Sequence, residues 1–315
     1  MNLGLIHPPA FAGVAGLIVI VMASPVAGSY LAFGIVFLTG LAVVFMRGDW
    51  RRARGLEQLI LFGPIFYAAP VAGFGAEHFT LTDGIASIIP AWIPWHVFWT
   101  LLLGACFIAG GLSLVTGIQA RLTATLFGIT FFLFVALMHG PSWAHDPHNR
   151  TALTVALRET SFSGGAFALA GSLSDRTRQS SARWLATLAR YFVAIPVLFF
   201  SVEQFLHGSQ VPGVPLERIT PAYVLGHSIW TYAAAVVYAI AGVLLLVNRK
   251  TRPAAAWLGL TVFLIELLVY VPIGAVDRAS LGNGFNYMAD TLMFCGAVLL
   301  LAGAMPCETV SASTG

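Results

Sequence analysis

Long apolar stretches, following one another along the chain, constrain this sequence more than any other feature. Crossing about 30 Å of hydrocarbon at about 1.5 Å per residue takes a helix of about 20 apolar residues. The sequence therefore predicts an all-α, polytopic membrane protein. Its ten expected transmembrane helices, of which the first and sixth are short, cover residues 9–24, 27–46, 57–76, 96–117, 121–140, 157–173, 185–206, 227–247, 253–272 and 285–305.

The amino-acid composition fits this class of protein and argues against others. Hydrophobic residues make up 58% of the 315 residues and charged residues only 9%, against about a quarter in soluble domains. The net charge of +3 is small and the basic residues are scattered, so we expect no nucleic-acid partner. The three cysteines form no CxxC pair, and the chain has no haem, dinucleotide, iron–sulfur or zinc-protease motif.

Lysine and arginine gather on one side of the predicted membrane path. In α-helical membrane proteins the loops rich in these residues face the cytoplasm. We therefore expect a multi-pass protein of the cell (inner or plasma) membrane with both termini in the cytoplasm and outer loops at 77–95, 141–156, 207–226 and 273–284. The cytoplasmic side then holds 12 of the 16 basic residues, namely Arg47, Arg51, Arg52, Arg54, Arg121, Arg176, Arg178, Arg183, Arg190, Arg249, Lys250 and Arg252.

An internal repeat covers much of the chain. Residues 96–141 align without gaps with residues 227–272 at an offset of 131, and 13 of these 46 positions are identical. Each repeated unit is expected to contain four helices, and an even number of helices gives both units the same orientation in the membrane. The predicted organisation is an N-terminal helical hairpin with a basic loop (1–55) followed by two parallel-repeat four-helix bundles (56–174 and 184–305). Each bundle could hold its own site, or one site could lie between them.

Most groups capable of acid–base or ligand chemistry map to the predicted outer face. Seven of the eight histidines lie there, at His78, His96, His139, His145, His148, His207 and His227. In the first unit, polar residues at four helix ends would meet at one membrane depth, where a helical bundle can hold a cavity. The candidate catalytic residues there are Glu77, His96, His139, Arg158 and Glu159, and Glu77, His96 and His139 are also candidate metal ligands.

The second unit keeps this pattern with substitutions. Tyr270 stands where the first unit has His139, and Asp290 falls where Arg158 would align. Glu266 lies about 9 Å inside its helix, a depth at which a carboxylate by default faces a bundle interior or a wet cavity. The candidate cofactor-binding residues of this unit are Glu203, His227, Glu266, Tyr270 and Asp290.

Structural roles compete with each of these assignments. Arg158 and Glu159 could pair with each other or with Glu77 as a purely structural ion pair. His78 lies at interfacial depth, where an uncharged histidine costs little, so a structural role is favoured for it. His96 could be an interfacial anchor beside the tryptophans that follow and precede it.

Several short motifs carry a resemblance to a known family. They are EHF from Glu77, IPAWIPWHVFW ending at Trp99, ARLTATLFG from Ala120, HGP from His139 and RETSFSGGA from Arg158. With these motifs the first unit resembles the DoxX/DoxD-like family of small four-helix membrane proteins, and the second unit resembles it more weakly. The resemblance implies a tandem fusion of two such units and carries Glu77, His96, His139 and Arg158 over as site positions. The second unit departs from the pattern at Tyr270 and Asp290.

The resemblance also implies a link to redox metabolism. Founding members of the family are subunits of a thiosulfate:quinone oxidoreductase, and others assist oxidant defence or sulfur handling beside soluble partners. Our leading hypothesis is a redox-associated membrane protein that handles a quinone, or a small sulfur or oxidant substrate, together with a soluble or membrane redox partner. A metal-binding or transport protein, and a non-catalytic anchor or assembly subunit, are the alternatives.

Overall fold

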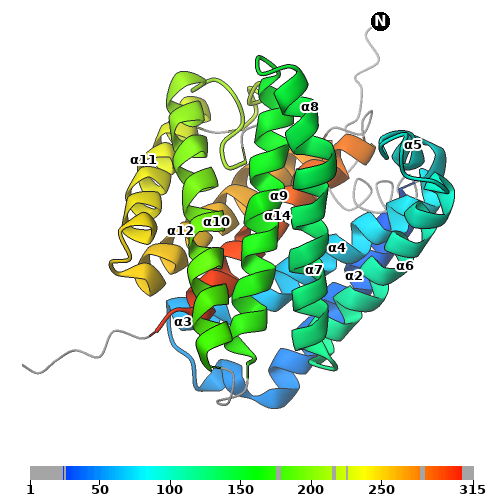
Figure 1. The fold of residues 1–315 in the computed structure, drawn as a ribbon. Coiled ribbons are helices and arrows are strands. Elements are labelled where there is room, and N and C mark those ends of the chain that lie inside the picture. Colours follow the sequence, from blue (N-terminus) through cyan, green and yellow to red (C-terminus); the bar gives the residue numbers. More distant parts are fainter. Residues whose placement is uncertain are drawn as a thin grey trace, which may run out of the picture.

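The computed structural model describes residues 24, 26–174, 179–214, 218–224, 226–276 and 281–306. Within this part of the chain all regular elements are helical, apart from one isolated bridge between Gln210 and Ile219. Eight helices are long and apolar enough to cross a membrane. The protein is therefore an all-helical, multi-pass integral membrane protein, whose helices pack as one bundle (Figure 1).

The helices follow one another with short connections. They are α2 (Ala27–Arg47), η1 (Asp49–Arg51), α3 (Leu56–Ile60), α4 (Gly63–Thr80), α5 (Thr82–Ser87), α6 (His96–Thr116), α7 (Ala120–Phe134), α8 (Gly140–His145), α9 (Arg150–Ser172), α10 (Gln179–Leu206), α11 (His227–Leu246), α12 (Thr251–Ile265), α13 (Val271–Val276) and α14 (Leu281–Ala304). Two π-helical turns, η2 (Val135–His139) and η4 (Glu266–Tyr270), continue α7 and α12.

Two of the ten expected spans are not among the eight apolar helices. The first, residues 9–24, lies outside the described residues except for Ser24. The sixth forms α9, which begins seven residues earlier than expected, at Arg150 rather than at 157. This helix is less apolar because it carries Arg158 and Glu159, and it lies inside the bundle against α7, α10 and α14. The prediction that small residues would place it among other helices fits this position.

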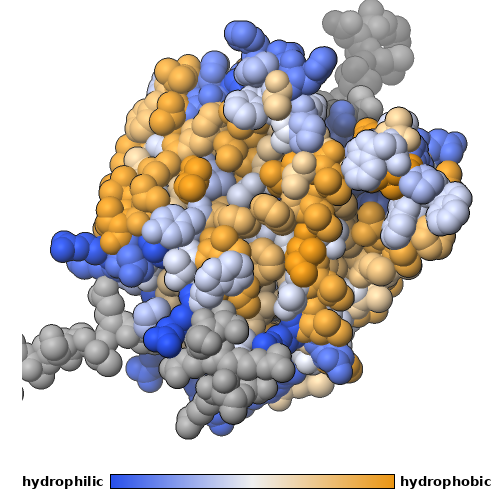
Figure 2. Space-filling view, in the orientation of Figure 1, coloured by the Kyte–Doolittle hydropathy of each residue, from blue (hydrophilic) through white to orange (hydrophobic). Residues whose placement is uncertain are grey.

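The outer surface is suited to lipid. Figure 2 shows apolar side chains over most of the middle of the bundle and hydrophilic residues gathered toward its two ends. Large apolar side chains are exposed on the peripheral helices, among them Leu38 on α2, Phe98 on α6 and Ile240 on α11. In water such a surface would promote association, whereas in a bilayer it meets hydrocarbon.

The sequence led us to expect two four-helix bundles, but the helices of the two presumed units interleave in the packing. The first helix of each presumed unit lies against the fourth helix of the other, because α4 packs on α14 and α10 packs on α9. The two fourth helices, α9 and α14, also pack on each other. Glycines allow α9 to approach both α14 and α10 closely: a side-chain carbon at Gly165 would collide with Ala297 of α14, and one at Gly164 would lie 3.1 Å from the carbonyl oxygen of Ala189 on α10.

Helix boundaries recur at the offset of 131 found in the sequence. The helices α7 and α12, the turns η2 and η4, and the helices α8 and α13 all coincide at this offset. Each π-helical turn is followed by a proline at the second position, Pro141 or Pro272. Because proline has no backbone N–H, it leaves a carbonyl of the preceding turn without its usual partner, which favours such a local change of hydrogen bonding.

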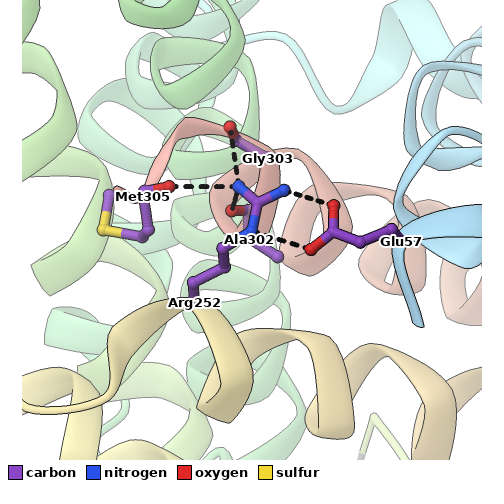
Figure 3. Close-up of polar contacts among 5 residues, drawn as sticks. All are labelled: Glu57, Arg252, Ala302, Gly303 and Met305. Carbon is purple, nitrogen blue, oxygen red and sulfur yellow. Dashed lines mark hydrogen bonds and ion pairs between the residues drawn. The ribbon is translucent and has the colours of Figure 1, made fainter. Parts of the chain in front are cut away.

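Arginines at one end of the bundle hold the C-termini of three helices. Arg47 donates to the carbonyl oxygen of Thr116 at the end of α6, at 2.9 Å, and Arg190 donates to the last turn of α11. Arg252 binds both carboxylate oxygens of Glu57, at 3.0 and 2.5 Å, and the carbonyls of Ala302, Gly303 and Met305 at the C-terminal end of α14 (Figure 3). These cations meet the negative ends of the helix dipoles.

We expect Arg252→Met to lower the free energy of unfolding by about 1–3 kcal/mol, because three carbonyls at the end of α14 lose a charged donor. Glu57→Gln should cost less than about 1 kcal/mol, since the Glu57 side chain is half exposed and surface ion pairs contribute little. Reversible unfolding in mixed micelles measures both values. Arg249→Met, at an exposed arginine in the preceding turn, is the matched control and should be nearly neutral.

Candidate functional site

A cavity of about 290 Å³ lies between α4, α5, α6, α7, α9 and α14. It is at the end of the bundle opposite the one where Arg47, Arg190 and Arg252 bind helix C-termini. Much of its wall is aromatic. Phe131 stacks on Phe107 with ring centroids 5.7 Å apart and meets Phe162 edge-on at the same distance. Its polar lining consists of Glu77, His78, Thr100, His139, Arg158, Glu159, Asn286 and Asp290.

Four of the five predicted catalytic residues therefore come together, and their pairing differs from the one expected. Arg158 does not pair with Glu159 or Glu77 but with Asp290 of α14, with Nη1 2.5 Å from Oδ2. Glu159 instead binds His139, with Oε1 3.1 Å from Nε2. The reason is the packing of α14 against α9, which brings a carboxylate of the second unit to Arg158.

Glu77 is 7% exposed and its carboxylate faces the neighbouring helix α14. With its amide nitrogen turned toward Glu77, Asn286 donates to both carboxylate oxygens, at 2.8 and 3.2 Å. Asn286 and Asp290 are four residues apart on α14, so they share one face of that helix. The cavity wall is thus completed by a helix of the second unit.

Two polar atoms in this lining are buried without a hydrogen-bond partner. They are Nε of Arg158, a donor, and Oε2 of Glu159, an acceptor. An unsatisfied buried polar group costs about 1–3 kcal/mol, so such groups commonly meet a ligand or an ordered water. A donor and an acceptor on adjacent residues suit a ligand that carries hydroxyl or carbonyl oxygen.

The lining residues carry more acid than base. Three carboxylates, Glu77, Glu159 and Asp290, face one guanidinium, that of Arg158, and two histidines, His78 and His139. A carboxylate only accepts hydrogen bonds unless it is protonated. The cavity therefore favours ligands with hydrogen-bond donors and suits the transfer of protons.

His96 lies apart from this group. It begins α6 and lines a shallow surface pocket with its sequence neighbours Ile93–Phe98, whereas the cavity is reached by residues from Thr100 onward. The metal site expected from Glu77, His96 and His139 is thus not assembled, because one helix turn separates His96 from the cavity lining. Among the described residues no group of three or more His, Cys, Asp or Glu side chains could hold a metal ion.

In the second unit, three of the candidate residues occupy different surroundings. Glu203 binds Arg150 and lies 3.8 Å from His207. Tyr270 donates to the carbonyl oxygen of Pro212 at 2.8 Å. Glu266 is buried in η4, and its Oε2 has no partner. The side chain of His227 lies outside the described residues, and Asp290 belongs to the cavity of the first unit.

The loop after α10 fills the region beside Tyr270. Val211 and Val214 are buried, and the peptide group between Pro212 and Gly213 binds Tyr270 and Gln204. In the first unit the corresponding segment forms α5, whose Ile85 only lines the cavity wall. This loop is five residues longer than its counterpart, because Glu77-His78-Phe79 matches Glu203-Gln204-Phe205 at an offset of 126 and the next helices match at 131. The longer loop is the part of the chain that packs into the second unit.

Three polar lining residues, His78, Thr100 and Asn286, were not among the candidates chosen from the sequence. His78 was judged an ordinary interfacial histidine, yet it is 9% exposed and its Nδ1 lies 2.8 Å from the carbonyl oxygen of Phe74. The sequence signal that could have identified His78 was its position next to Glu77, which was already a candidate. Asn286 could have been found from Asp290, because residues four apart share a helix face.

No family model matches the chain, and no curated protein and no solved structure is significantly similar to it.

Proposed function

We propose that this protein binds the headgroup of a quinone or quinol in the cavity between α4, α6, α7, α9 and α14. The observation that supports this most directly is the combination of an aromatic wall with an unpartnered donor, Arg158 Nε, and an unpartnered acceptor, Glu159 Oε2. A flat apolar ring with oxygen atoms at its edge matches both parts of such a lining.

The chemistry open to the chain itself is binding and proton exchange. The His139–Glu159 pair can accept a proton from a hydroxyl of the ligand, because an imidazole nitrogen and a carboxylate are both proton acceptors. The electrons would pass between the ligand and a redox partner, soluble or in the membrane. The protein is then a redox-associated membrane component, in keeping with the DoxX/DoxD-like resemblance of its motifs.

The same proposal includes the orientation and origin of the fold. The arginine-rich end would face the cytoplasm by the positive-inside rule, which places the cavity near the outer face. The helices α4–α9 and α10–α14 would be two copies of one unit, as the coincident helix boundaries suggest. Arg158 and Asp290, at corresponding positions, would then pair across the axis that relates the copies.

The test is binding of decylubiquinone to the purified protein, measured as the ligand-dependent rise in unfolding temperature. We expect His139→Phe to weaken binding at least about tenfold, because it removes the partner of Glu159 and leaves that carboxylate without a counter-group. Tyr270→Phe is the matched control, since it makes the same residue at the corresponding position of η4 and leaves the cavity unchanged.

Equal weakening by the two variants would contradict this assignment. So would wild-type protein that shows no shift at saturating decylubiquinone, none with menadione, a smaller naphthoquinone, and none with decylubiquinol. The latter result would favour the anchor or assembly role, in which the cavity residues only stabilise helix ends.

A further inference from the structure

The second unit fills with its own chain the place that corresponds to the cavity. We call the buried segment Val211–Val214 of the loop after α10 the plug, and Gly213 lies at its centre. A side-chain carbon on Gly213 would lie 3.5 Å from Ile265, 3.7 Å from Tyr270 and 3.8 Å from Thr291. At the offsets of the repeat, 131 for α12 and 132 for α14, these residues correspond to Phe134, His139 and Glu159. All three of the latter line the cavity of the first unit.

One peptide group of the plug makes the polar contacts. The Pro212 carbonyl accepts a hydrogen bond from the Tyr270 hydroxyl at 2.8 Å. The N–H of Gly213, which belongs to the same peptide bond, donates to Oε1 of Gln204 at 3.2 Å. A flat group is therefore held from two sides, by a donor on its oxygen and by an acceptor on its N–H.

The acceptor in this arrangement has a counterpart in His78. Gln204 corresponds to His78 at the offset of 126 that aligns the Glu-His-Phe and Glu-Gln-Phe segments. Both side chains bind the carbonyl four residues earlier, Gln204 that of Phe200 at 3.1 Å and His78 that of Phe74 at 2.8 Å. A nitrogen that faces a carbonyl must carry the proton, so Nδ1 of His78 is the donor and Nε2 of the neutral ring is an acceptor.

We propose that the first unit holds its ligand in the way that the second unit holds the Pro212–Gly213 peptide group, and that His78 Nε2 accepts a hydrogen bond from a hydroxyl of that ligand. This rests on the proposed function and narrows it to the reduced, quinol form. A quinol offers two O–H donors and a quinone offers none. Two acceptors are available to it: Nε2 of His78, whose side chain lines the cavity, and the buried Oε2 of Glu159, whereas Arg158 Nε is the unpartnered donor.

A quinone in the same place would leave the histidine nitrogen facing a carbonyl oxygen. Both atoms are acceptors, so the contact costs the hydrogen bond and adds repulsion. Selectivity of this kind is strong where a site is built to bond a hydroxyl, because the analogue without it leaves a buried polar group unpaired. His78 is therefore a specificity-determining residue for the redox state of the ligand.

The experiment compares the dissociation constants of decylubiquinol and decylubiquinone under anaerobic conditions, for the wild type, His78→Leu and His78→Gln. We expect the wild type to bind the quinol at least about tenfold more tightly than the quinone. His78→Gln should keep that ratio, since glutamine makes the paired contacts seen at Gln204. His78→Leu should reduce the ratio about tenfold and leave quinone affinity nearly unchanged.

The ratio of the two dissociation constants distinguishes a specific loss of quinol binding from general damage to the fold, because a partly misfolded variant loses affinity for both ligands together. Equal affinities of the wild type for the two forms, or an unchanged ratio in His78→Leu, would overturn the inference and leave the proposed function standing. A wild-type protein that binds neither form would overturn both.

Discussion

Asp290→Ala is expected to lower the free energy of unfolding by about 3–5 kcal/mol, which would be the largest effect of any single polar substitution in this chain. Both members of the Arg158–Asp290 pair are largely buried, with side chains 13% and 11% exposed, and they lie 2.5 Å apart. Removing the carboxylate leaves a guanidinium uncompensated inside the bundle. Reversible unfolding in mixed detergent micelles measures the loss.

The double variant Arg158→Met/Asp290→Leu separates a stranded charge from lost packing. Replacing a buried ion pair by apolar residues of similar volume is often nearly neutral or stabilising. We therefore expect the double variant to regain most of the stability that Asp290→Ala loses. A double variant as unstable as the single one would show that the charge left on Arg158 is not the cause.

Gly165→Leu is the second substitution with a large expected effect, a loss of about 3 kcal/mol or failure to accumulate in the membrane. Even one side-chain carbon at this position would overlap Cα, Cβ and the carbonyl oxygen of Ala297 on α14, and backbone cannot move aside as a flexible side chain can. Accumulation of full-length protein in membranes and the unfolding midpoint are the measurements.

Gly34→Leu is the control for this effect, because a side-chain carbon at Gly34 on α2 meets nothing within 4 Å. It should be tolerated with little change. If both glycine variants behave alike, the contact between α9 and α14 is not what limits the stability of the bundle.

Much of the fold follows from the sequence, and the reasons are local. Apolar length alone predicted most of the long helices, and the small residues around Gly164 and Gly165 indicated a helix in close contact with others. The length of α9 was missed at its start because Arg150 and Thr151 look like loop residues. Their placement depends on tertiary contacts, since Arg150 binds Glu203 and Gln210 on neighbouring segments.

The site was predictable within one unit and not between units. Glu77, His139, Arg158 and Glu159 could be expected to meet because each lies near the same end of its helix. The pairing of Arg158 with Asp290 could not be expected, since it depends on how α14 packs against α9 and α4. His96 was included because it begins a helix at the right depth, but depth does not say which way a helix end faces.

The packing of the plug in the second unit could not be predicted either, because it also depends on contacts between distant segments. Its loop is five residues longer than the one in the first unit, which the alignment showed, but length does not reveal that Val211 and Val214 pack inward. Only the structure places the Pro212–Gly213 peptide beside Tyr270 and Gln204. That contact is also what gives His78 its proposed role.

The account depends most on the claim that the cavity of the first unit receives the quinone ring. Photolabelling with an azidoquinone, followed by mass spectrometry of the peptides, tests it most directly. The account predicts that the label lies on cavity-lining residues between Phe131 and His139 or between Val155 and Phe162, and that excess decylubiquinol removes it. A label spread over the lipid-facing surfaces of α2 and α11, unaffected by decylubiquinol, would contradict it.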